Sequence, residues 1–285
     1  MLARLKVVLE FVKFEHTVFA LPFAFLGMAL AAGGWPGWRV AFWVTAAMVG
    51  ARCAAMSFNR IADLRYDALN PRTRTRPLVS GALSPPFAWA FLAVSSALFV
   101  VSAGMLNRLA LALALPALAV VLGYSLTKRF TSASHLALGL ALGLAPVGGW
   151  VAVRGTIDHP PLLLSLAVLC WTAGFDIIYA CQDVDFDTRA GLWSLPRRVG
   201  VARALTASRW LHAAMVALLA AVGWLCGLRA WYAAGVVLVS GILWIEHRLV
   251  RADDLSRVNA AFFTANGWLS LLFFLLAALD LTLAR

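Results

Sequence analysis

The chain has 285 residues, of which 62% are apolar and only 13% are charged. This composition excludes an ordinary soluble domain and indicates a membrane protein. The 24 Lys and Arg residues against 13 Asp and Glu residues give a formal net charge of +11. In a membrane protein such an excess sets the orientation, so nucleic acid is not needed as a partner to explain it.

Nine apolar stretches follow one another along the chain, each close to the ~20 residues that a helix needs to cross a membrane. They span residues 14–34, 38–58, 87–105, 109–127, 135–153, 161–182, 203–225, 230–249 and 261–283. Because these stretches use most of the chain, the sequence predicts one all-α, multi-pass membrane domain over residues 1–285. The first stretch carries Pro22 and lacks a small-residue cleavage site, so we do not expect a removable signal peptide.

The basic residues mark one end of these predicted helices. Eighteen of them lie in the N-terminal segment or beside the loops after the second, fourth, sixth and eighth stretches, and five lie on the opposite side. By the positive-inside rule, the N-terminus and these loops face the cytoplasm, in the inner (cytoplasmic) membrane of the cell. The four cysteines all fall within predicted helices and predict neither a disulfide framework nor a zinc site.

Acidic side chains gather where the second stretch reaches this basic side. In the segment FNRIADLRYD, Asn59, Asp63 and Asp67 follow one another at intervals of four residues. On a continuous helix that advances 100° per residue, these three side chains share one face within about 80°. The sequence therefore predicts a polar stripe at the cytoplasmic end of this helix.

A second acidic group follows the sixth stretch, in the segment DIIYACQDVDFD. Four side chains share one face if the helix continues through them, namely Asp176, Tyr179, Asp183 and Asp187. Asp185 points the other way. The last two of the four repeat the spacing of the first motif, so we expect two carboxylate pairs that face one another.

Four carboxylates brought together repel one another unless cations offset their charge. Hard oxygen ligands with open coordination positions suit Mg²⁺, which favours phosphate oxygens as its remaining ligands. The two motifs therefore predict a magnesium-dependent site for a diphosphate. Several basic side chains on the same side are placed to neutralise phosphate oxygens: Arg72, Arg74, Arg76, Lys128 and Arg129.

Simpler interpretations exist for each of these features. Loop arginines such as Arg74 are commonly topology signals only, Asp185 is a solvated charge, and Tyr179 is an amphipathic interface residue. A carboxylate at a helix C-terminus opposes the helix dipole and needs compensation, which favours the metal site over a surface ion pair. His16, next to Glu15, is interpreted as a structural histidine, and the other four histidines show no ligand spacing.

Taken in order, these motifs resemble those of the UbiA family of intramembrane prenyltransferases. That family pairs an NxxxDxxxD motif after the second helix with a DxxxD motif after the sixth, which here read NRIADLRYD and DVDFD. Its RTxxRPL and YxxxKR patterns are similar to RTRTRPL at 72–78 and YSLTKR at 124–129. The segments KFEHTVFALPFA, ARCAAMSFNRIAD and FDIIYACQDVDFD look closest to the 4-hydroxybenzoate polyprenyltransferases, including their relatives in menaquinone synthesis by the futalosine route.

The resemblance implies nine transmembrane helices around a central cavity that opens to the cytoplasmic side. It assigns the magnesium and diphosphate positions, with the carboxylates as the catalytic groups, to Asn59, Asp63, Asp67, Asp183 and Asp187. Diphosphate contacts fall to Arg72, Arg76 and Lys128, which Arg129 adjoins. Asp176 and Tyr179 are implied to line the same cavity, where we expect them to bind the acceptor.

Arg52 is the one basic residue placed well inside a predicted helix. It lies seven residues before Asn59, on the same helical face within about 20° and some 10 Å deeper. An arginine at this depth is costly unless it faces a polar cavity or a partner. It therefore either pairs with Asp176 or Glu15, or binds the carboxylate of an aromatic acid, as the matching arginine of the family implies.

The expected reaction is an electrophilic substitution on an aromatic ring by the allylic group of a polyprenyl diphosphate. We expect 4-hydroxybenzoate as the acceptor, in ubiquinone biosynthesis, with a dihydroxynaphthoate in menaquinone synthesis as the alternative. The cofactor is Mg²⁺, and the partners are the two substrates and the lipid bilayer. Prenyl length, the group that accepts the ring proton, and the oligomeric state do not follow from the sequence.

Two other classes of membrane protein also use carboxylates. A cation-coupled transporter places acidic residues near mid-membrane or on both sides, but here they cluster at one face, with Asp158 and Asp280 isolated opposite. A phosphatidyl-alcohol transferase carries a glycine-bearing acidic signature, and this chain contains no Asp-Gly pair. Prenyl transfer is the interpretation that accounts for both motifs.

Overall fold

The computed structural model describes residues 2–13, 17–258 and 266–283. Over these ranges the chain is helical and forms no β-strand. Eight helices have the length and hydropathy of a membrane span: α3 (Trp38–Ala62), α5 (Pro85–Leu106), α6 (Arg108–Thr127), α7 (Ser134–Arg154), α8 (His159–Ala180), α11 (Val201–Leu225), α12 (Ala230–Leu249) and α14 (Asn266–Leu283). The predicted all-α membrane fold is confirmed.

The first predicted span is shorter than the others in the described residues. It forms α2 (Thr17–Ala32), an apolar helix of 16 residues that contains Pro22. Residues 14–16, with Glu15 and His16, precede it and lie outside the described ranges. The count of nine membrane spans therefore stays a prediction.

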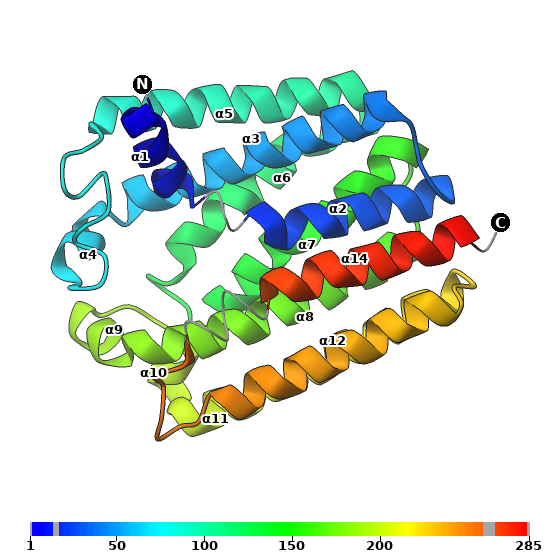
Figure 1. The fold of residues 1–285 in the computed structure, drawn as a ribbon. Coiled ribbons are helices and arrows are strands. Elements are labelled where there is room, and N and C mark those ends of the chain that lie inside the picture. Colours follow the sequence, from blue (N-terminus) through cyan, green and yellow to red (C-terminus); the bar gives the residue numbers. More distant parts are fainter. Residues whose placement is uncertain (1, 14–16, 259–265, 284–285) are drawn as a thin grey trace.

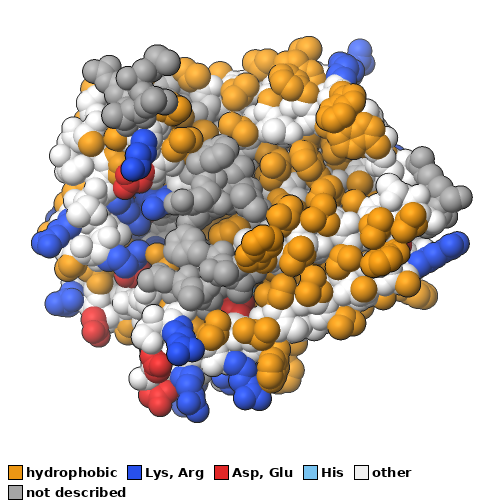
Figure 2. Space-filling model, viewed as in Figure 1, with side chains coloured by type: hydrophobic (Ala, Val, Ile, Leu, Met, Phe, Trp, Pro, Cys, Tyr) orange, Lys and Arg blue, Asp and Glu red, His pale blue; other side chains and the backbone are white. Residues whose placement is uncertain are grey.

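Short helices gather at one end of the molecule. They are α1 (Leu2–Val12), α4 (Leu64–Leu69), the 3-10 turn η2 (Cys181–Asp183), α9 (Val184–Ala190) and α10 (Leu195–Val199). Figure 1 shows α4, α9 and α10 together at the left end of the elongated bundle. On the face drawn in Figure 2, most acidic and basic side chains lie at this same end, and apolar side chains cover much of the remainder. Such a division fits a protein whose long helices are surrounded by lipid.

The long helices close into a ring that α2 divides. Each packs on the next in chain order from α3 to α14, and α14 and α3 both contact α2. α2 also crosses to α7, which requires close backbone approach. A Cβ added to Gly149 would stand 2.0 Å from the Ala24 carbonyl oxygen, and one added to Gly27 would stand 2.2 Å from that of Pro146. Small residues thus let α2 and α7 form a shared wall.

Large side chains fill one side of this wall. Trp171 of α8 is fully buried and its ring centroid lies 5.0 to 6.4 Å from those of Phe19, Phe23 and Phe175. Phe273 of α14 continues the cluster at 6.2 Å from Phe23. Aromatic packing of this kind makes the half enclosed by α8, α11, α12 and α14 a solid core.

A buried polar network joins the helices of this core. The Trp171 indole donates to the Asn266 amide oxygen at 2.6 Å, and the Asn266 amide donates to Glu246 at 3.2 Å. His212 Nδ1 lies 2.9 Å from His247 Nε2. These contacts give Asn266 and the two histidines structural partners within the bundle.

Candidate active site

Both aspartate motifs lie where a long helix breaks into a short one. α3 stops before Asp63, which has φ −92° and ψ 6°, and α4 follows. α8 passes through the 3-10 turn into α9, and Asp183 has φ −102° and ψ 7° at that junction. Asp67 and Asp187 lie in the short helices and are buried. Neither motif therefore lies on one continuous α-helix, which is the condition for each predicted polar face, but the two breaks repeat one backbone geometry.

The loop between α4 and α5 reaches across to α8 through Arg72. Its Nε and Nη2 donate to the two carboxylate oxygens of Asp183 at 3.2 and 2.6 Å, and its Nη1 donates to the Tyr179 hydroxyl at 2.9 Å. Burial opposes the charge of Arg72, but the Asp183 carboxylate and Tyr179 hold its pKa above the ordinary value. The structure thus brings Arg72, Tyr179 and Asp183 together.

Arg76 pairs with the first motif in a similar way. Its Nη1 lies 2.6 Å from both carboxylate oxygens of Asp67. The Thr73 hydroxyl donates to the Asp67 carbonyl at 3.0 Å, which fixes the loop against α4. By contrast, Arg74 is exposed to solvent, as expected of a topology signal.

Asp63 lies between an amide and a guanidinium. The Asn59 amide donates to Asp63 at 3.1 Å, and Arg129 Nη2 lies 3.5 Å from its other oxygen. Arg129 also donates to the last carbonyl of α3 at 2.6 Å. Burial and the Asp67 carboxylate raise the pKa of Asp63, against the opposing effect of Lys128 and Arg129.

Lys128, at the end of α6, lies near carboxylates of both motifs. Burial opposes its charge, yet its pKa is raised by four carboxylates: Asp176, Asp187, Asp183 and Asp63. Its carbonyl accepts a hydrogen bond from the Trp193 backbone N–H at 2.6 Å, which ties the loop after α9 to the end of α6. Lys128 therefore lies centrally among the predicted site residues.

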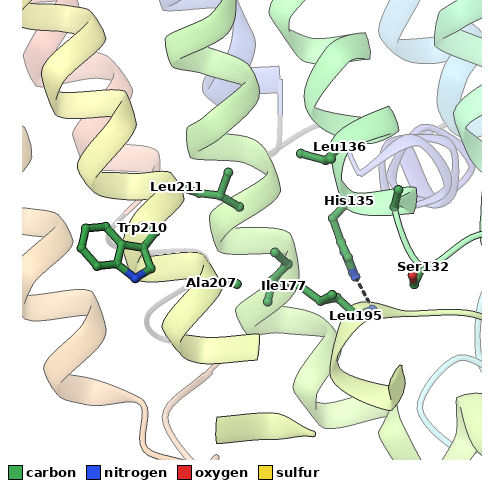
Figure 3. A pocket seen from close by; sticks show the side chains of 9 residues that line it. Ser132, His135, Leu136, Ile177, Leu195, Ala207, Trp210 and Leu211 are labelled. Atoms are coloured by element: carbon green, nitrogen blue, oxygen red, sulfur yellow. Dashed lines mark hydrogen bonds between the residues drawn. The ribbon is translucent and has the colours of Figure 1, made fainter. Parts of the chain in front are cut away.

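Asp176 has a partner that its sequence position does not indicate. Its Oδ2 lies 2.6 Å from Nδ1 of His135, which is 1% exposed in the first turn of α7. His135 Nε2 accepts a hydrogen bond from the Leu195 backbone N–H at 3.2 Å. Figure 3 shows this second contact as a dashed line, beside an apolar pocket of about 520 Å³ that Ile177 and Trp210 help to line.

A cavity of about 410 Å³ lies on the other side of the α2–α7 wall. It is lined from α2, α3, α5, α6 and α7, mainly by Ala, Val and Leu, with Phe175 of α8. Its polar lining side chains are Arg52 and Tyr124. Tyr124 lies one helical turn before Lys128, so the polar end of the cavity is the end toward the aspartate motifs.

Arg52 does not pair with Asp176, which is taken by His135. Its Nε is buried without a hydrogen-bond partner, and no carboxylate in the described ranges forms an ion pair with it. Glu15, the other proposed partner, lies outside those ranges. Arg60 of α3, for which the sequence analysis gave no role at the site, is 5% exposed and also has a buried, unpaired Nε.

The donor atoms of the two motifs fit a divalent cation in type, but in this structure most of the carboxylates are engaged in ion pairs. Asn59 and the four aspartates offer only oxygen ligands, which Mg²⁺ prefers. In the part of the chain that the structure describes, no three carboxylate, imidazole or thiol groups lie close enough to hold one metal ion. Three of the four aspartates instead form ion pairs with arginines: Asp63, Asp67 and Asp183. The predicted pairs of facing carboxylates are thus separated by ion pairs, which a bound metal must displace.

Comparison with known proteins identifies the family. Residues 20–278 match the model of the UbiA prenyltransferase family. The chain belongs to this family. It is therefore a multi-pass membrane enzyme of the prenyltransferase class. A 4-hydroxybenzoate octaprenyltransferase of Herminiimonas arsenicoxydans is 31% identical over 243 residues, 84% of each chain. A mitochondrial 4-hydroxybenzoate polyprenyltransferase of Drosophila melanogaster is 32% identical over 255 residues, 88% of this chain and 64% of that protein.

Solved UbiA structures share the fold. The apo structure of a UbiA homolog from Aeropyrum pernix K1 is 37% identical, with a TM-score of 0.82 over 95% of this chain and 98% of that one. A UbiA homolog from Archaeoglobus fulgidus bound to GPP and Mg²⁺ is 23% identical, with a TM-score of 0.78 over 97% and 99%. The chain therefore shares its overall fold with both structures.

Proposed function

We propose that this enzyme transfers a polyprenyl group from a polyprenyl diphosphate to the ring of an aromatic hydroxy acid, 4-hydroxybenzoate in the first place. The curated relatives named above carry that acceptor in their names. Arg52 is the observation in this chain that carries the choice of an acid. The reaction takes place at the end of the bundle where the two aspartate motifs lie.

A carboxylate explains an otherwise unpaired charge. Arg52 lines an apolar cavity and has no carboxylate partner in the described ranges. A guanidinium in such surroundings is costly, and the planar fork of arginine matches a carboxylate with two parallel hydrogen bonds. An aromatic acid bound there places its ring toward Tyr124 and the motifs.

The apolar cavity suits the hydrocarbon tail of the donor. Most of its lining consists of small and branched aliphatic side chains, which need no hydrogen-bond partners. An isoprenoid chain can therefore lie against them without leaving polar groups unsatisfied. The diphosphate then lies at the charged end, against Arg72, Arg76, Lys128 and Arg129. These side chains exchange carboxylate partners for phosphate oxygens as the substrate enters.

A divalent metal completes the site. Asn59, Asp63, Asp67, Asp183 and Asp187 would hold it, and when bound it would supply charge stabilisation to the departing diphosphate. The basic side chains stabilise the same leaving group electrostatically. The loops after α4 and α9 exclude water, which would otherwise react with the allylic carbon.

Purified enzyme in detergent or liposomes tests the proposal. Labelled prenyl diphosphates of several lengths are offered with Mg²⁺ and 4-hydroxybenzoate, a dihydroxynaphthoate, or phenol as the acceptor without a carboxylate. We expect prenylation of 4-hydroxybenzoate and none of phenol. Exclusive use of the dihydroxynaphthoate would place the enzyme in menaquinone synthesis, and equal use of phenol would remove the role proposed for Arg52.

A further inference from the structure

We propose that His135 is a positioning residue that holds the Asp176 carboxylate ready to accept the proton lost from the prenylated ring. The inference rests on the proposed function and goes beyond it by naming the base and the residue that orients it. Neither role follows from the two aspartate motifs. Both follow from the contacts of three helices that meet at one imidazole.

The hydrogen bonds fix the tautomer of His135. Its Nε2 accepts from the Leu195 backbone N–H at 3.2 Å, so this nitrogen carries a lone pair and the proton resides on Nδ1. Nδ1 then donates to Asp176 Oδ2 at 2.6 Å. The imidazole is neutral in this arrangement, and it orients the carboxylate in the way that outer-shell partners orient reactive groups.

The imidazole is itself immobilised by the fold. His135 is at the start of α7, Asp176 is on α8, and Leu195 is the first residue of α10. Figure 3 shows the ring directed from α7 toward Leu195, with apolar side chains on the pocket side. The Leu195 N–H is one of the donors that a helix N-terminus leaves without an intrahelical acceptor, and His135 satisfies it.

Burial separates the orienting group from the reactive group. The side chain of His135 is 2% exposed and that of Asp176 is 17% exposed. Oδ1 of Asp176 receives no hydrogen bond from any residue in the described ranges, so it is available to a substrate.

On α8, Asp176 lies between a residue that lines the cavity and a residue that contacts the charged cluster. Phe175, the preceding residue, lines the apolar cavity, and Tyr179, one turn later, receives a hydrogen bond from Arg72. Asp176 is also the carboxylate with the largest effect in raising the pKa of Lys128. It therefore lies between the cavity and the charged cluster, where the reacting ring has to be.

The chemistry needs a base at this point. A ring electron pair forms the bond to the allylic carbon as the allylic C–O bond breaks, and the electrons of that bond leave with the diphosphate. The hydrogen on the substituted ring carbon then departs as a proton to Asp176 Oδ1. Its C–H electron pair returns to the ring and restores aromaticity. A positioned carboxylate makes this proton transfer fast.

Two substitutions of His135 distinguish a role in positioning Asp176 from a role in holding α10 in place. In His135→Asn the amide nitrogen stands near the place of Nδ1, so the donor to Asp176 is kept and the acceptor for Leu195 is lost. In His135→Gln the amide oxygen stands near the place of Nε2, so the acceptor for Leu195 is kept and the donor to Asp176 is lost. Both variants, Asp176→Asn and the wild type are compared for kcat, for KM of each substrate and for melting temperature in detergent.

We expect His135→Gln and Asp176→Asn to lower kcat by about 10-fold or more, a loss typical of an impaired general base. His135→Asn should retain kcat within a few-fold, and both KM values should change little. Acceptor deuterated at the two ring positions beside the hydroxyl adds a second readout. Proton loss becomes slow when the base is misplaced, so a primary isotope effect should appear in His135→Gln and Asp176→Asn but not in the wild type.

The outcomes are distinguishable from failure of the proposed function. If the wild type prenylates no aromatic acid, the function itself is wrong and this inference falls with it. If the wild type is active but His135→Gln keeps wild-type kcat, the positioning role alone is wrong. The role is also overturned if kcat follows melting temperature, with His135→Asn the more impaired variant, because His135 then serves only to hold α10.

Discussion

Several charged side chains near the two motifs are paired with a group on another element, whereas Arg52 and Arg60 each have a buried Nε without a hydrogen-bond partner in the described ranges. Arg72 binds Asp183 and Arg76 binds Asp67, so these two arginines of the loop are neutralised locally. Arg52 faces the cavity without such a partner in the described residues. Under the proposed function, the paired charges mark the end that binds the diphosphate, and the unpaired charge of Arg52 marks the end that binds the carboxylate.

Replacing Arg52 with Lys tests the carboxylate end. Lys keeps the positive charge but loses the two-pronged hydrogen bond, so KM for the aromatic acid should rise about 10-fold, as expected when roughly 1.4 kcal/mol of binding energy is lost. KM for the prenyl diphosphate should stay within about 2-fold. Arg203→Lys, at an exposed position on α11, is the matched control and should resemble the wild type in both values. An equal rise in the two KM values would make Arg52 a scaffold residue.

Neighbouring aspartates provide a second comparison. Asp183 is buried and ion-paired, whereas Asp185, two residues later, is exposed. Asp183→Asn should lower kcat/KM by roughly 100-fold or more because the leaving diphosphate loses metal-assisted stabilisation. Asp185→Asn should remain within about 2-fold, and chelation of divalent cations should abolish the wild-type rate reversibly. Full activity of Asp183→Asn, or in the presence of the chelator, would contradict the metal site.

Sequence patterns identified the motif residues but not their partners. The four-residue spacing of Asp63 and Asp67 is a local property, and the breaks in the helices leave both residues at the site. His135 has no such signal, because it reaches Asp176 only through the packing of α7 against α8. Arg72 and Asp183 are 111 residues apart in the sequence, so their ion pair likewise depends on how the loop after α4 packs against the end of α8.

Among the helices, the most consequential contact is the wall between α2 and α7. It divides the ring into a solid aromatic core and an open cavity, and it depends on glycine. Apolar stretches predicted the helices within a few residues, since hydrophobic length is read directly from the sequence. Periodicity could not show where a cavity forms between the helices, because that depends on the size of residues from six different helices.

Gly149→Ala tests this wall. The added Cβ would meet the backbone of α2 at 2.0 Å, which forces the helices apart and costs roughly 1–3 kcal/mol by overpacking. The melting temperature in detergent should fall clearly. Gly148→Ala, at the next residue, adds a Cβ with nothing within 4 Å and is the control for helix propensity and solvent effects. Equal melting temperatures for the two variants would mean that α2 and α7 are not closely packed.

Taken as a whole, the molecule has one charged end and a body of apolar helices. α4, α9 and α10 lie at the charged end, with both aspartate motifs and the paired arginines (Figures 1 and 2). Under the proposed function, a soluble aromatic acid reaches this end from the aqueous phase, while the prenyl tail of the donor lies among the helices. The side of the membrane on which this end lies therefore decides which metabolites the enzyme meets.

We predict that the charged end faces the cytoplasm, because eighteen basic residues mark that side and five mark the other. Single cysteines are introduced into a variant whose four native cysteines are replaced by serine. Ala68 and Thr75, both exposed near the first motif, report on the charged end, and Ile157, 46% exposed between α7 and α8, reports on the other. In intact cells a membrane-impermeant thiol reagent that crosses the outer membrane should label Cys at 157 only, and all three positions should react after the inner membrane is opened. Labelling of 68 and 75 in intact cells, with 157 protected, would invert the orientation and place the acceptor site outside the cytoplasm.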